Sequence, residues 1–419
     1  MMYVTEELRT PLGEFYDVIV AGGGPAGCCA AIAAARAGAK TLLVEQSGCF
    51  GGMWTGGLVN PVYDHANKTG LMKEIVTALS QRRGFGGFID SCCHIEDMKS
   101  LLDEMLTEAG VCLLTNTFAA GVLKEDGAIT GIVVENKSGR TAYPAAVVVD
   151  CTGDADICAR AGVQTVFGDE ETGEVQSFTL MYQLGNVRFM QTDPYALTKL
   201  VEDTNARTGK NYEIPFTRSY IIQLPADDQA GVMLTHMRSL DPLDEKDRTA
   251  AMIEGRRQAR EMFLYFKENV PGFEELTFTQ TASMLGVRES RRLVGLHTIT
   301  IEDCLRGVIP SDSVTVATFN VDIHNQKNND QGYFDVQPYG IPYRSMVPVY
   351  ADGLLVAGRC ISGTHEAMAS YRVTGNCAAM GQAAGCAAAL CAKLGCQPRE
   401  LPFADLRSLL KEQSVELPE

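Results

Sequence analysis

The sequence predicts an α/β fold in which a parallel sheet with flanking helices is interrupted by an inserted α+β domain. Two segments, 17–45 and 354–394, each combine short buried strands with Ala- and Gly-rich helices. The stretch between them is richer in charged and aromatic residues. We therefore expect a discontinuous domain made of residues 14–165 and 344–419, with residues 166–343 inserted as a second domain.

The first strands and helix form a β-α-β unit within residues 17–45. The β-branched run 17–21 is typical of a strand buried on both faces, and the alanine-rich helix after it ends at Gly38. A second buried strand over 41–44 leads directly to Glu45. This order of elements is the context in which a glycine-rich turn binds a nucleotide.

A GxGxxG pattern, formed by Gly22, Gly24 and Gly27, lies between that first strand and the helix. The first glycine permits a tight turn, the second lets a pyrophosphate approach the backbone, and the third lets helix and strand pack closely. The anion then lies on the helix N-terminus. Glu45 can accept hydrogen bonds from both ribose hydroxyls and would repel a 2′-phosphate, which disfavours NADP. The pattern predicts a dinucleotide site.

The elements that follow have different periodicities. Residues 95–109 have apolar side chains at helical spacing, and a strand is expected over 111–114. Residues 117–149 alternate apolar and polar side chains between two glycine-containing turns, which predicts an antiparallel meander ending in a buried strand over 146–150. In the inserted stretch, an amphipathic helix is expected near 244–268.

Three further segments favour FAD over NAD. Residues 48–57 are too rich in glycine for an ordinary loop, and residues 151–154 follow the buried strand that ends at Asp150. Residues 358–360 follow another buried strand over 354–357. A dinucleotide contacted from four separate segments is predicted to be long, buried and permanently bound, as FAD is.

Charge and cysteine content exclude several classes of function. The chain of 419 residues has 36 Lys and Arg against 52 Asp and Glu, a net charge of −16, which disfavours binding to nucleic acid or to an anionic membrane. The 14 cysteines have no CxxC or zinc-type spacing, so we expect small buried thiols in a reducing cytoplasm and no metal. No export signal is visible, and the apolar stretches 18–35 and 378–394 favour buried helices over membrane insertion.

Together these features resemble the superfamily of FAD-dependent oxidoreductases that fold like glutathione reductase and the fumarate reductase flavoprotein subunits. The chain is most similar to a bacterial branch of FAD-dependent oxidoreductases. The motifs that carry this resemblance are LGVRESRRLVG (285–295), VDIHN (321–325), IPYRSMVP (341–348), LLVAGRCISGTH (354–365), SYRVTG (370–375) and GQAAG (381–385). The resemblance implies a Rossmann-like FAD-binding domain of the glutathione-reductase type, with an inserted α+β substrate or cap domain.

The resemblance also assigns individual positions to FAD. They are Gly22, Gly24, Gly27 and Glu45 for the pyrophosphate and adenosine ribose; Gly51, Gly52, Met53 and Thr55 for the flavin side; Ala119, Thr152, Gly153 and Asp154 for the adenine and the nucleotide end; and Arg359, Gly375 and Asn376 beside the ribityl chain and the pyrimidine ring. The sequence lacks both a CxxxxC redox pair and the Ser-His pair of covalent flavin attachment. We therefore expect noncovalent FAD.

Two arginine-containing segments are candidates for the substrate side. Arg288 lies in the segment 288–292 with two further arginines and Glu289. This segment is either a structural ion-pair cluster, or Arg288 binds an anionic substrate or the negative charge of reduced flavin. Tyr343 and Arg344 are second-rank candidates, because a tyrosine can serve as an acid and an arginine can polarise a carbonyl.

Two histidines are candidates for proton transfer. His324, in VDIHN, and His365, shortly after Arg359, lie where the flavin is expected, although a structural role is as well supported by the sequence. The sequence favours a structural or surface role for His94 and His236, and also for His297.

The sequence thus predicts a FAD-dependent oxidoreductase that transfers a hydride between a small organic substrate and noncovalently bound FAD. One alternative is a pyridine-nucleotide reductase, which would require a second GxGxxG that the middle region lacks. Another is a flavin-binding electron-transfer or assembly subunit without turnover of its own. The electron donor or acceptor and the oligomeric state are not specified by the sequence.

Overall fold

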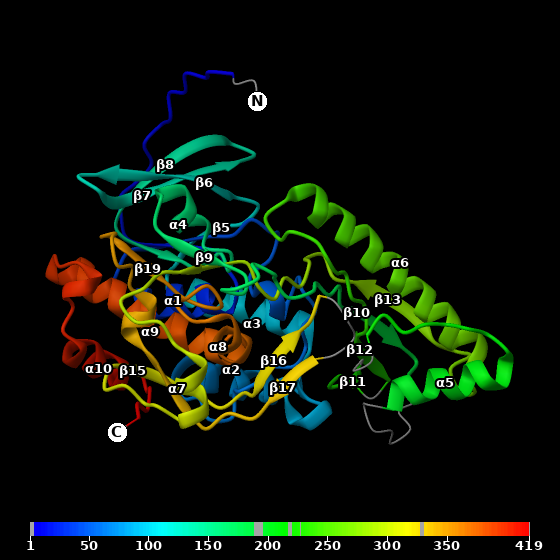
Figure 1. Ribbon diagram of the computed structural model, residues 1–419. Coiled ribbons are helices and arrows are strands. Elements are labelled where there is room, and N and C mark those ends of the chain that lie inside the picture. Colours follow the sequence, from blue (N-terminus) through cyan, green and yellow to red (C-terminus); the bar gives the residue numbers. More distant parts are fainter. Residues whose placement is uncertain (1–3, 188–195, 217–219, 227, 327–330, 419) are drawn as a thin grey trace.

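The computed structural model describes residues 4–418 apart from 188–195, 217–219, 227 and 327–330 (Figure 1). The strands of its largest sheet are β1 (Tyr16–Ala21), β2 (Thr41–Val44), β5 (Cys112–Leu114), β6 (Phe118–Glu125), β7 (Ala128–Asn136), β8 (Gly139–Asp150) and β19 (Leu354–Val356). Their order is β5-β2-β1-β8-β7-β6, and β19 pairs with β8. The sheet contains the expected parallel strands and confirms the predicted α/β class.

The long strand β8 belongs to both halves of this sheet. Its first residues, 139–144, pair antiparallel with β7, which in turn pairs antiparallel with β6. Its last residues, 145–150, pair parallel with β1, and residues 148–150 also pair with β19. The last strand of the predicted meander and the predicted buried strand are therefore one continuous strand.

The parallel strands end together at one edge of the sheet. Val44 pairs with both Ala21 and Leu114, while Asp150 pairs with both Ala21 and Val356. In open α/β sheets, ligands bind beyond the carboxyl ends of the strands. The loops that follow these five residues are consequently the ones that can build a binding site.

Helices cover this sheet and extend beyond it (Figure 1). They are α1 (Pro25–Arg36), α2 (Gly70–Gln81), α3 (Ile95–Glu108), α4 (Asp156–Ala161), α5 (Ala196–Thr208), α6 (Glu245–Asn269), α7 (Ile301–Arg306), α8 (His365–Tyr371), α9 (Thr374–Leu394) and α10 (Phe403–Glu412). The predicted amphipathic helix near 244–268 is α6, and Asp244 caps it by accepting from Lys246 N at 2.8 Å.

Helices α1 and α9 pack against each other very closely. A Cβ atom on Gly381 would lie 2.0 Å from Ala26 O, and one on Gly385 would lie 2.1 Å from Ala30 O. By length and composition α9 could cross a membrane, but 72% of its apolar window is buried inside the protein. Residues 25–35 and 378–394 thus lie in buried helices, as predicted, whereas residues 18–21 belong to the buried strand β1. The small residues of the two helices permit this approach of their backbones.

A second sheet lies beside the first, near α5 and α6, in the green part of Figure 1. Its antiparallel strands have the order β11-β12-β10-β13 and are β10 (Tyr182–Gly185), β11 (Tyr220–Gln223), β12 (Gln229–Met233) and β13 (Thr277–Thr281). Leu184, Val232 and Phe266 belong to its own hydrophobic core. Leu293 and Ile341, from the later part of the predicted insertion, pack instead in the core of the first sheet.

The described residues also form four short two-stranded sheets. They pair β3 (Phe85–Gly86) with β4 (Cys92–Cys93), β9 (Thr165–Phe167) with β14 (Arg291–Leu293), β15 (Ser313–Ala317) with β18 (Tyr339–Pro342), and β16 (Val321–His324) with β17 (Gln331–Phe334). Strand β16 carries Asp322 and His324, both of which line the cavity described below.

Candidate active site

A cavity of about 300 Å³ lies beyond the carboxyl edge of the parallel sheet, within the range of about 300–1,000 Å³ typical of ligand pockets. All four segments that the sequence assigns to a dinucleotide contribute to its walls. The second sheet and the loop after it close the other side. That side includes Thr179, Met181, Ile222, Met233, Met284, Leu285, Val287 and Arg288.

The three glycines of the GxGxxG loop have distinct roles. Gly22 has φ +96°, and a Cβ there would lie 2.5 Å from Cys151 O. A Cβ on Gly27 would lie 1.7 Å from Gly22 O, so this glycine permits the close packing of helix and strand. Gly24 lines the cavity, and a Cβ there would have no atom within 4 Å. The backbone at Gly24 is therefore open to a pyrophosphate.

Glu45 joins the end of β2 to the glycine loop. Its side chain is buried, with Oε2 accepting from Gly23 N at 2.6 Å and Oε1 accepting from Ser47 N at 2.7 Å. A carboxylate has about four lone-pair sites, so two such bonds leave capacity for ribose hydroxyls. Glu45 also lines the cavity, which suits it to both tasks.

The second glycine-rich loop contributes only part of its predicted residues. Gly52 and Met53 line the cavity. Gly51, with φ +101°, instead donates from its backbone N to Gly23 O at 2.7 Å. Thr55 is buried and donates from Oγ1 to a backbone carbonyl of its own loop at 2.6 Å. Gly51 and Thr55 thus stabilise the loop and do not face the cavity.

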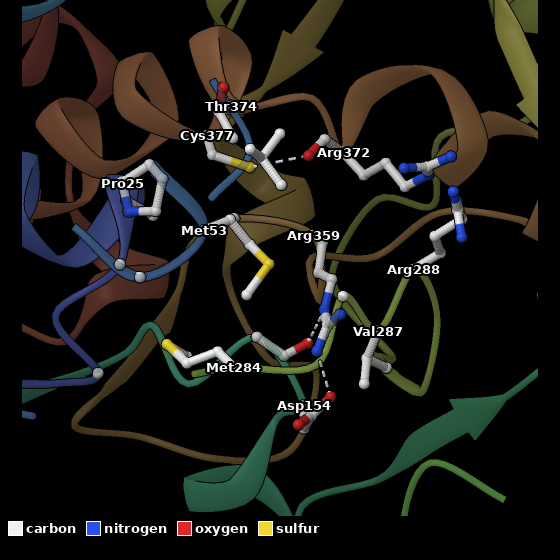
Figure 2. Close-up of a pocket in the computed structure, with 18 of the residues that line it drawn as sticks. Pro25, Met53, Asp154, Met284, Val287, Arg288, Arg359, Arg372, Thr374 and Cys377 are labelled. Atoms are coloured by element: carbon white, nitrogen blue, oxygen red, sulfur yellow. Dashed lines mark hydrogen bonds and ion pairs between the residues drawn. The ribbon is translucent and has the colours of Figure 1, made fainter. Parts of the chain in front are cut away.

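Arg359 links the loop after β19 to the loop after β8 (Figure 2). Its Nε donates to Gly153 O at 2.7 Å, and its Nη2 forms an ion pair with Asp154 Oδ1. These three residues line the cavity, as do the predicted Ala119 and Thr152. The guanidinium is therefore fixed in place before any ligand binds.

At the start of α9 the contacts differ from the prediction. Gly375 does not line the cavity, and its N donates to Tyr63 O at 3.1 Å. Asn376 is fully buried outside the cavity wall, and its amide has no hydrogen-bond partner among the described residues. Thr374 and Cys377 line the cavity instead, and the Thr374 hydroxyl has no partner within the described part of the chain.

Arg288 is a buried cation in the cavity wall. Its side chain donates from Nη1 to Ser177 O and to Thr179 Oγ1, each at 2.8 Å. Among the described residues no carboxylate lies within ion-pair distance of its guanidinium. Burial lowers the pKa of Arg288 to about 9. Its charge is thus available to an anion that enters the cavity.

The neighbouring arginines form the structural ion-pair cluster that the sequence left open. Arg292 contacts Glu289 at 2.5 Å and Glu170 at 2.7 Å, outside the cavity. The predicted His365 joins this cluster, since its Nδ1 lies 2.9 Å from the Glu289 carboxylate. The structure therefore separates Arg288 from this cluster and places His365 within it, away from the cavity.

His324 lies in the cavity wall and is 2% exposed. Its Nε2 lies 3.1 Å from Asp322 Oδ2, and its Nδ1 lies 3.2 Å from His236 Nε2. Burial and the charge of Arg288 lower the pKa of His324 to about 4. His236, for which the sequence favoured a structural role, is thus a direct partner of the candidate proton-transfer group.

Tyr343 and Arg344 lie outside the cavity. The Tyr343 hydroxyl donates to Pro398 O at 2.9 Å. Arg344 makes a two-pronged ion pair with Asp312, with both nitrogen–oxygen distances 3.0 Å. Both side chains are engaged in contacts that join loops, so the geometry supports a structural role for each.

Arg372, which the sequence reasoning missed, faces the cavity at the end of α8. Its Nη2 donates to Asp322 O at 2.9 Å and to Asp322 Oδ2 at 3.3 Å, while its Nε is buried with no partner among the described residues. Figure 2 shows the guanidinium groups of Arg288 and Arg372 at the same end of the cavity. The only sequence signal for Arg372 was its place in the SYRVTG motif.

One protein family matches nearly the whole chain. Residues 17–410 match the family described as FAD dependent oxidoreductase. The chain belongs to that family. Its cofactor is FAD, and its fold is the Rossmann-like FAD-binding fold predicted from the sequence.

Individual relatives match over part of their length. A thiamine thiazole synthase of Aeropyrum pernix is 34% identical over 120 residues, which are 28% of this chain and 43% of that protein. A digeranylgeranylglycerophospholipid reductase of Thermoplasma volcanium is 26% identical over 172 residues, or 36% of this chain and 43% of that protein. The matched stretches thus span about half the length of these curated relatives.

Solved structures support the fold. A geranylgeranyl bacteriochlorophyll reductase-like protein from Thermoplasma acidophilum superimposes with a TM-score of 0.53 at 15% identity, covering 96% of this chain and 85% of that one. A flavin-dependent brominase superimposes with a TM-score of 0.50 at 14% identity, covering 94% and 83%. These neighbours do not single out the glutathione-reductase type, which stays a prediction.

The residues of the cavity fit FAD. The backbone at Gly24 is open, the Glu45 carboxylate has unused lone pairs, and the Thr374 hydroxyl is unsatisfied by described residues. Cys377 donates to Arg372 O at 3.2 Å, and burial raises its pKa to about 12, so it faces the cavity as a neutral thiol. The described residues contain no His, Cys, Asp or Glu cluster that could hold a metal ion.

Proposed function

We propose that the protein transfers a hydride between a small organic anion and noncovalently bound FAD. One observation carries this proposal: a single cavity joins the dinucleotide-binding loops to a wall that contains Arg288, Arg372 and His324. FAD, when bound, accepts or supplies the hydride, which is two electrons with one proton. The protein must bind the substrate, orient it and move the second proton.

The walls of the substrate end indicate the kind of molecule it binds. Among the described residues at this end of the cavity, Arg288 and Arg372 supply two positive charges and Asp322 one negative charge, which favours an anionic group on the substrate. The rest of the wall at this end is apolar and consists of Met181, Ile222, Met233, Met284 and Val287. The three methionine side chains are flexible. We propose a substrate with one carboxylate or similar anion attached to an apolar body.

The residues proposed to bind FAD lie in different parts of the cavity. We propose that Gly22, Gly24 and Glu45 bind the pyrophosphate and ribose, with Ala119 at the adenine end. Arg359, Met53 and Thr374 are proposed to face the flavin end. Gly27, Gly51, Thr55, Gly375 and Asn376 are proposed to hold the surrounding backbone, because none of them lines the cavity.

Finer features of the resemblance are proposals as well. We propose that residues 14–165 and 344–419 form the FAD-binding domain of glutathione-reductase type and that the insertion within 166–343 caps it, in a protein of bacterial origin. All 14 cysteines are free, which supports a reducing, cytoplasmic setting. The electron partner is proposed to be a separate molecule.

Replacing Gly24 tests the site with little risk to the fold. The purified protein is expected to be yellow, with absorbance near ~450 nm from FAD. The Gly24→Val variant should fold but lose FAD, since its side chain enters open space where the pyrophosphate is proposed to lie. Gly48→Ala is the matched control, because its Cβ would meet Asn116 at an ordinary 3.6 Å. A wild-type protein that binds no FAD would contradict the proposal.

A further inference from the structure

Two histidines and an aspartate form a hydrogen-bonded row in and behind the cavity wall. His236 Nδ1 lies 2.9 Å from Thr235 O, and His236 Nε2 lies 3.2 Å from His324 Nδ1. The row ends where His324 Nε2 lies 3.1 Å from Asp322 Oδ2. We refer to Asp322, His324 and His236 as the histidine row.

The histidine row is one proton short of satisfying its own contacts. Each of its three contacts requires one proton between the two heavy atoms, because a carbonyl and a carboxylate only accept. Two neutral imidazoles carry one proton each, and an ionised Asp322 carries none. The count is the same for every choice of tautomers. The row therefore has a place for one additional proton, which makes His324 an imidazolium beside the Asp322 carboxylate.

The rings are held so that they cannot easily turn away from this arrangement. Phe216 stacks on His236 with ring centroids 4.1 Å apart and an angle of 7° between the rings. The backbone N of His236 donates to Gln258 Oε1 at 2.9 Å, and that of His324 donates to Gln176 Oε1 at 3.2 Å. The stacking restrains the His236 ring, and the two backbone bonds hold the main chain of both histidines in place.

Charges on the neighbouring elements oppose that proton. Arg288, before β14, and Arg372, at the end of α8, both lower the pKa of His324, after the larger effect of its burial. Arg288, His324 and Arg238 act in the same direction on His236, again after burial. Asp322 is the carboxylate that favours the proton. Without a ligand, the effects that lower the pKa of His324 outweigh the effect of Asp322, so His324 is neutral at pH 7.

We propose that an anion bound at Arg288 and Arg372 is accompanied by uptake of one proton into the histidine row, so that the substrate loads its own proton donor. The inference rests on the proposed function for the identity of that anion. Neutralising the two guanidinium groups removes the charge that opposes the proton, while the unsatisfied Asp322–His324 contact supplies the place for it. Proton uptake and anion binding are then linked.

The loaded row suits reduction of the substrate, because that direction of the reaction needs a proton donor. In the transfer step one N–H bond at the Asp322–His324 end of the row breaks, its electron pair stays on the nitrogen, and the row returns to two neutral imidazoles and one carboxylate. The proton forms a bond to the substrate atom that gains an electron pair when the neighbouring carbon receives the hydride. His324 is the catalytic residue in this step, and His236 is a positioning residue that acts through it.

The first experiment measures the pKa of His324 in the FAD-loaded protein by NMR of labelled histidine, with His324→Gln to assign its signal. Arg288→Met, which removes the charge as a bound anion would, should raise this pKa by roughly one pH unit or more. Arg288→Lys keeps the charge and should leave it near the wild-type value. Equal values in the Met and Lys variants would overturn the proposal.

The second experiment uses the wild-type protein, so it does not depend on the folding of a variant. Benzoate is titrated into the FAD-loaded protein at pH 6 by calorimetry in two buffers that differ in ionisation enthalpy. Roughly half a proton or more should be taken up per benzoate, and none with its neutral analogue benzamide. Benzoate that binds without proton uptake, or no more tightly than benzamide, would overturn the proposal.

The role of His236 is tested by His236→Phe, which keeps an aromatic ring against Phe216. A single neutral His324 can then satisfy the one remaining contact with Asp322, so proton uptake with benzoate should disappear while FAD content is unchanged. Uptake equal to wild type would overturn this role. FAD content is measured in every sample, because loss of FAD would contradict the proposed function, whereas retained FAD without proton uptake contradicts only this inference.

Discussion

Glu45 Oε2 accepts a hydrogen bond from Gly23 N at 2.6 Å, which ties the end of the second parallel strand to the middle of the glycine loop. The carboxylate thereby positions the loop that opens onto the cavity and also faces the cavity itself. We therefore expect the loop geometry and the affinity for the adenosine half of FAD to depend on the same side chain.

Removing the charge of Glu45 should weaken FAD binding. Glu45→Gln keeps the size of the side chain, but its bonds to Gly23 N and to a ribose hydroxyl lose their charge-assisted character, worth about 1.5–3 kcal/mol. We expect the Kd for FAD, measured by fluorescence titration, to rise by roughly tenfold or more. Glu74→Gln, at an exposed ion pair with Arg36, is the control and should leave the Kd unchanged.

Enlarging Gly381 should destabilise the fold. In Gly381→Val the added side chain meets Ala26 O, and forcing α1 and α9 apart costs about 1–3 kcal/mol or more. The free energy of unfolding from urea titration should fall accordingly. Ala379→Val, at a half-buried position of the same helix, should have a smaller effect. Equal stability of Gly381→Val and wild type would show that the two helices do not pack this closely.

His365 should make the stability of the protein depend on pH. Burial lowers its pKa, but the hydrogen bond and charge of Glu289 outweigh burial and raise the pKa above its ordinary value of 6.5. Its stabilising contribution is therefore complete below pH 6.5 and is lost as the pH rises through the folded-state pKa. His365→Gln should lower the free energy of unfolding at pH 5.5 more than at pH 9. A difference that is larger at pH 9 would contradict this assignment.

Tyr343 should matter for stability and not for turnover. Tyr343→Phe removes the hydrogen bond to Pro398 O and leaves a buried carbonyl unpaired, at a cost of about 1–3 kcal/mol in the free energy of unfolding. The rate of anaerobic flavin bleaching by a substrate should be the same as in wild type, because Tyr343 lies outside the cavity. A large loss of rate with unchanged stability would return Tyr343 to the catalytic candidates.

Local patterns predicted which residues come together along one wall of the cavity. The strand, the glycine turn, the helix and the acid at the end of the next strand are close in sequence, and the geometry of a β-α-β unit places them together. Gly24 and Glu45 consequently line the cavity as expected. Within the same loop, however, Gly52 lines the cavity whereas Gly51 donates to Gly23 O, because the backbone turns at these two residues, both of which have positive φ.

The candidate residues that we predicted from their proximity to a motif do not all lie in the cavity wall. Arg288 and Arg292 lie in one short segment, yet one faces the cavity and the other joins a buried ion-pair cluster. His365 follows a residue that lines the cavity by six positions and still points away from it. The direction of each side chain is fixed by the segments that pack around it, and the local sequence does not contain those segments.

The sequence by itself determined the class of fold and the strand, glycine turn and helix that place Gly24 and Glu45 at the cavity, since these depend on strand and helix patterns and on glycine at positions that require it. Only the tertiary structure decided which polar groups meet at the substrate end. His236 and His324 are 88 residues apart, and their contact exists because β16 is brought beside the end of the second sheet. Hydrogen-bond partners so distant in sequence are selected by packing, which no local pattern encodes.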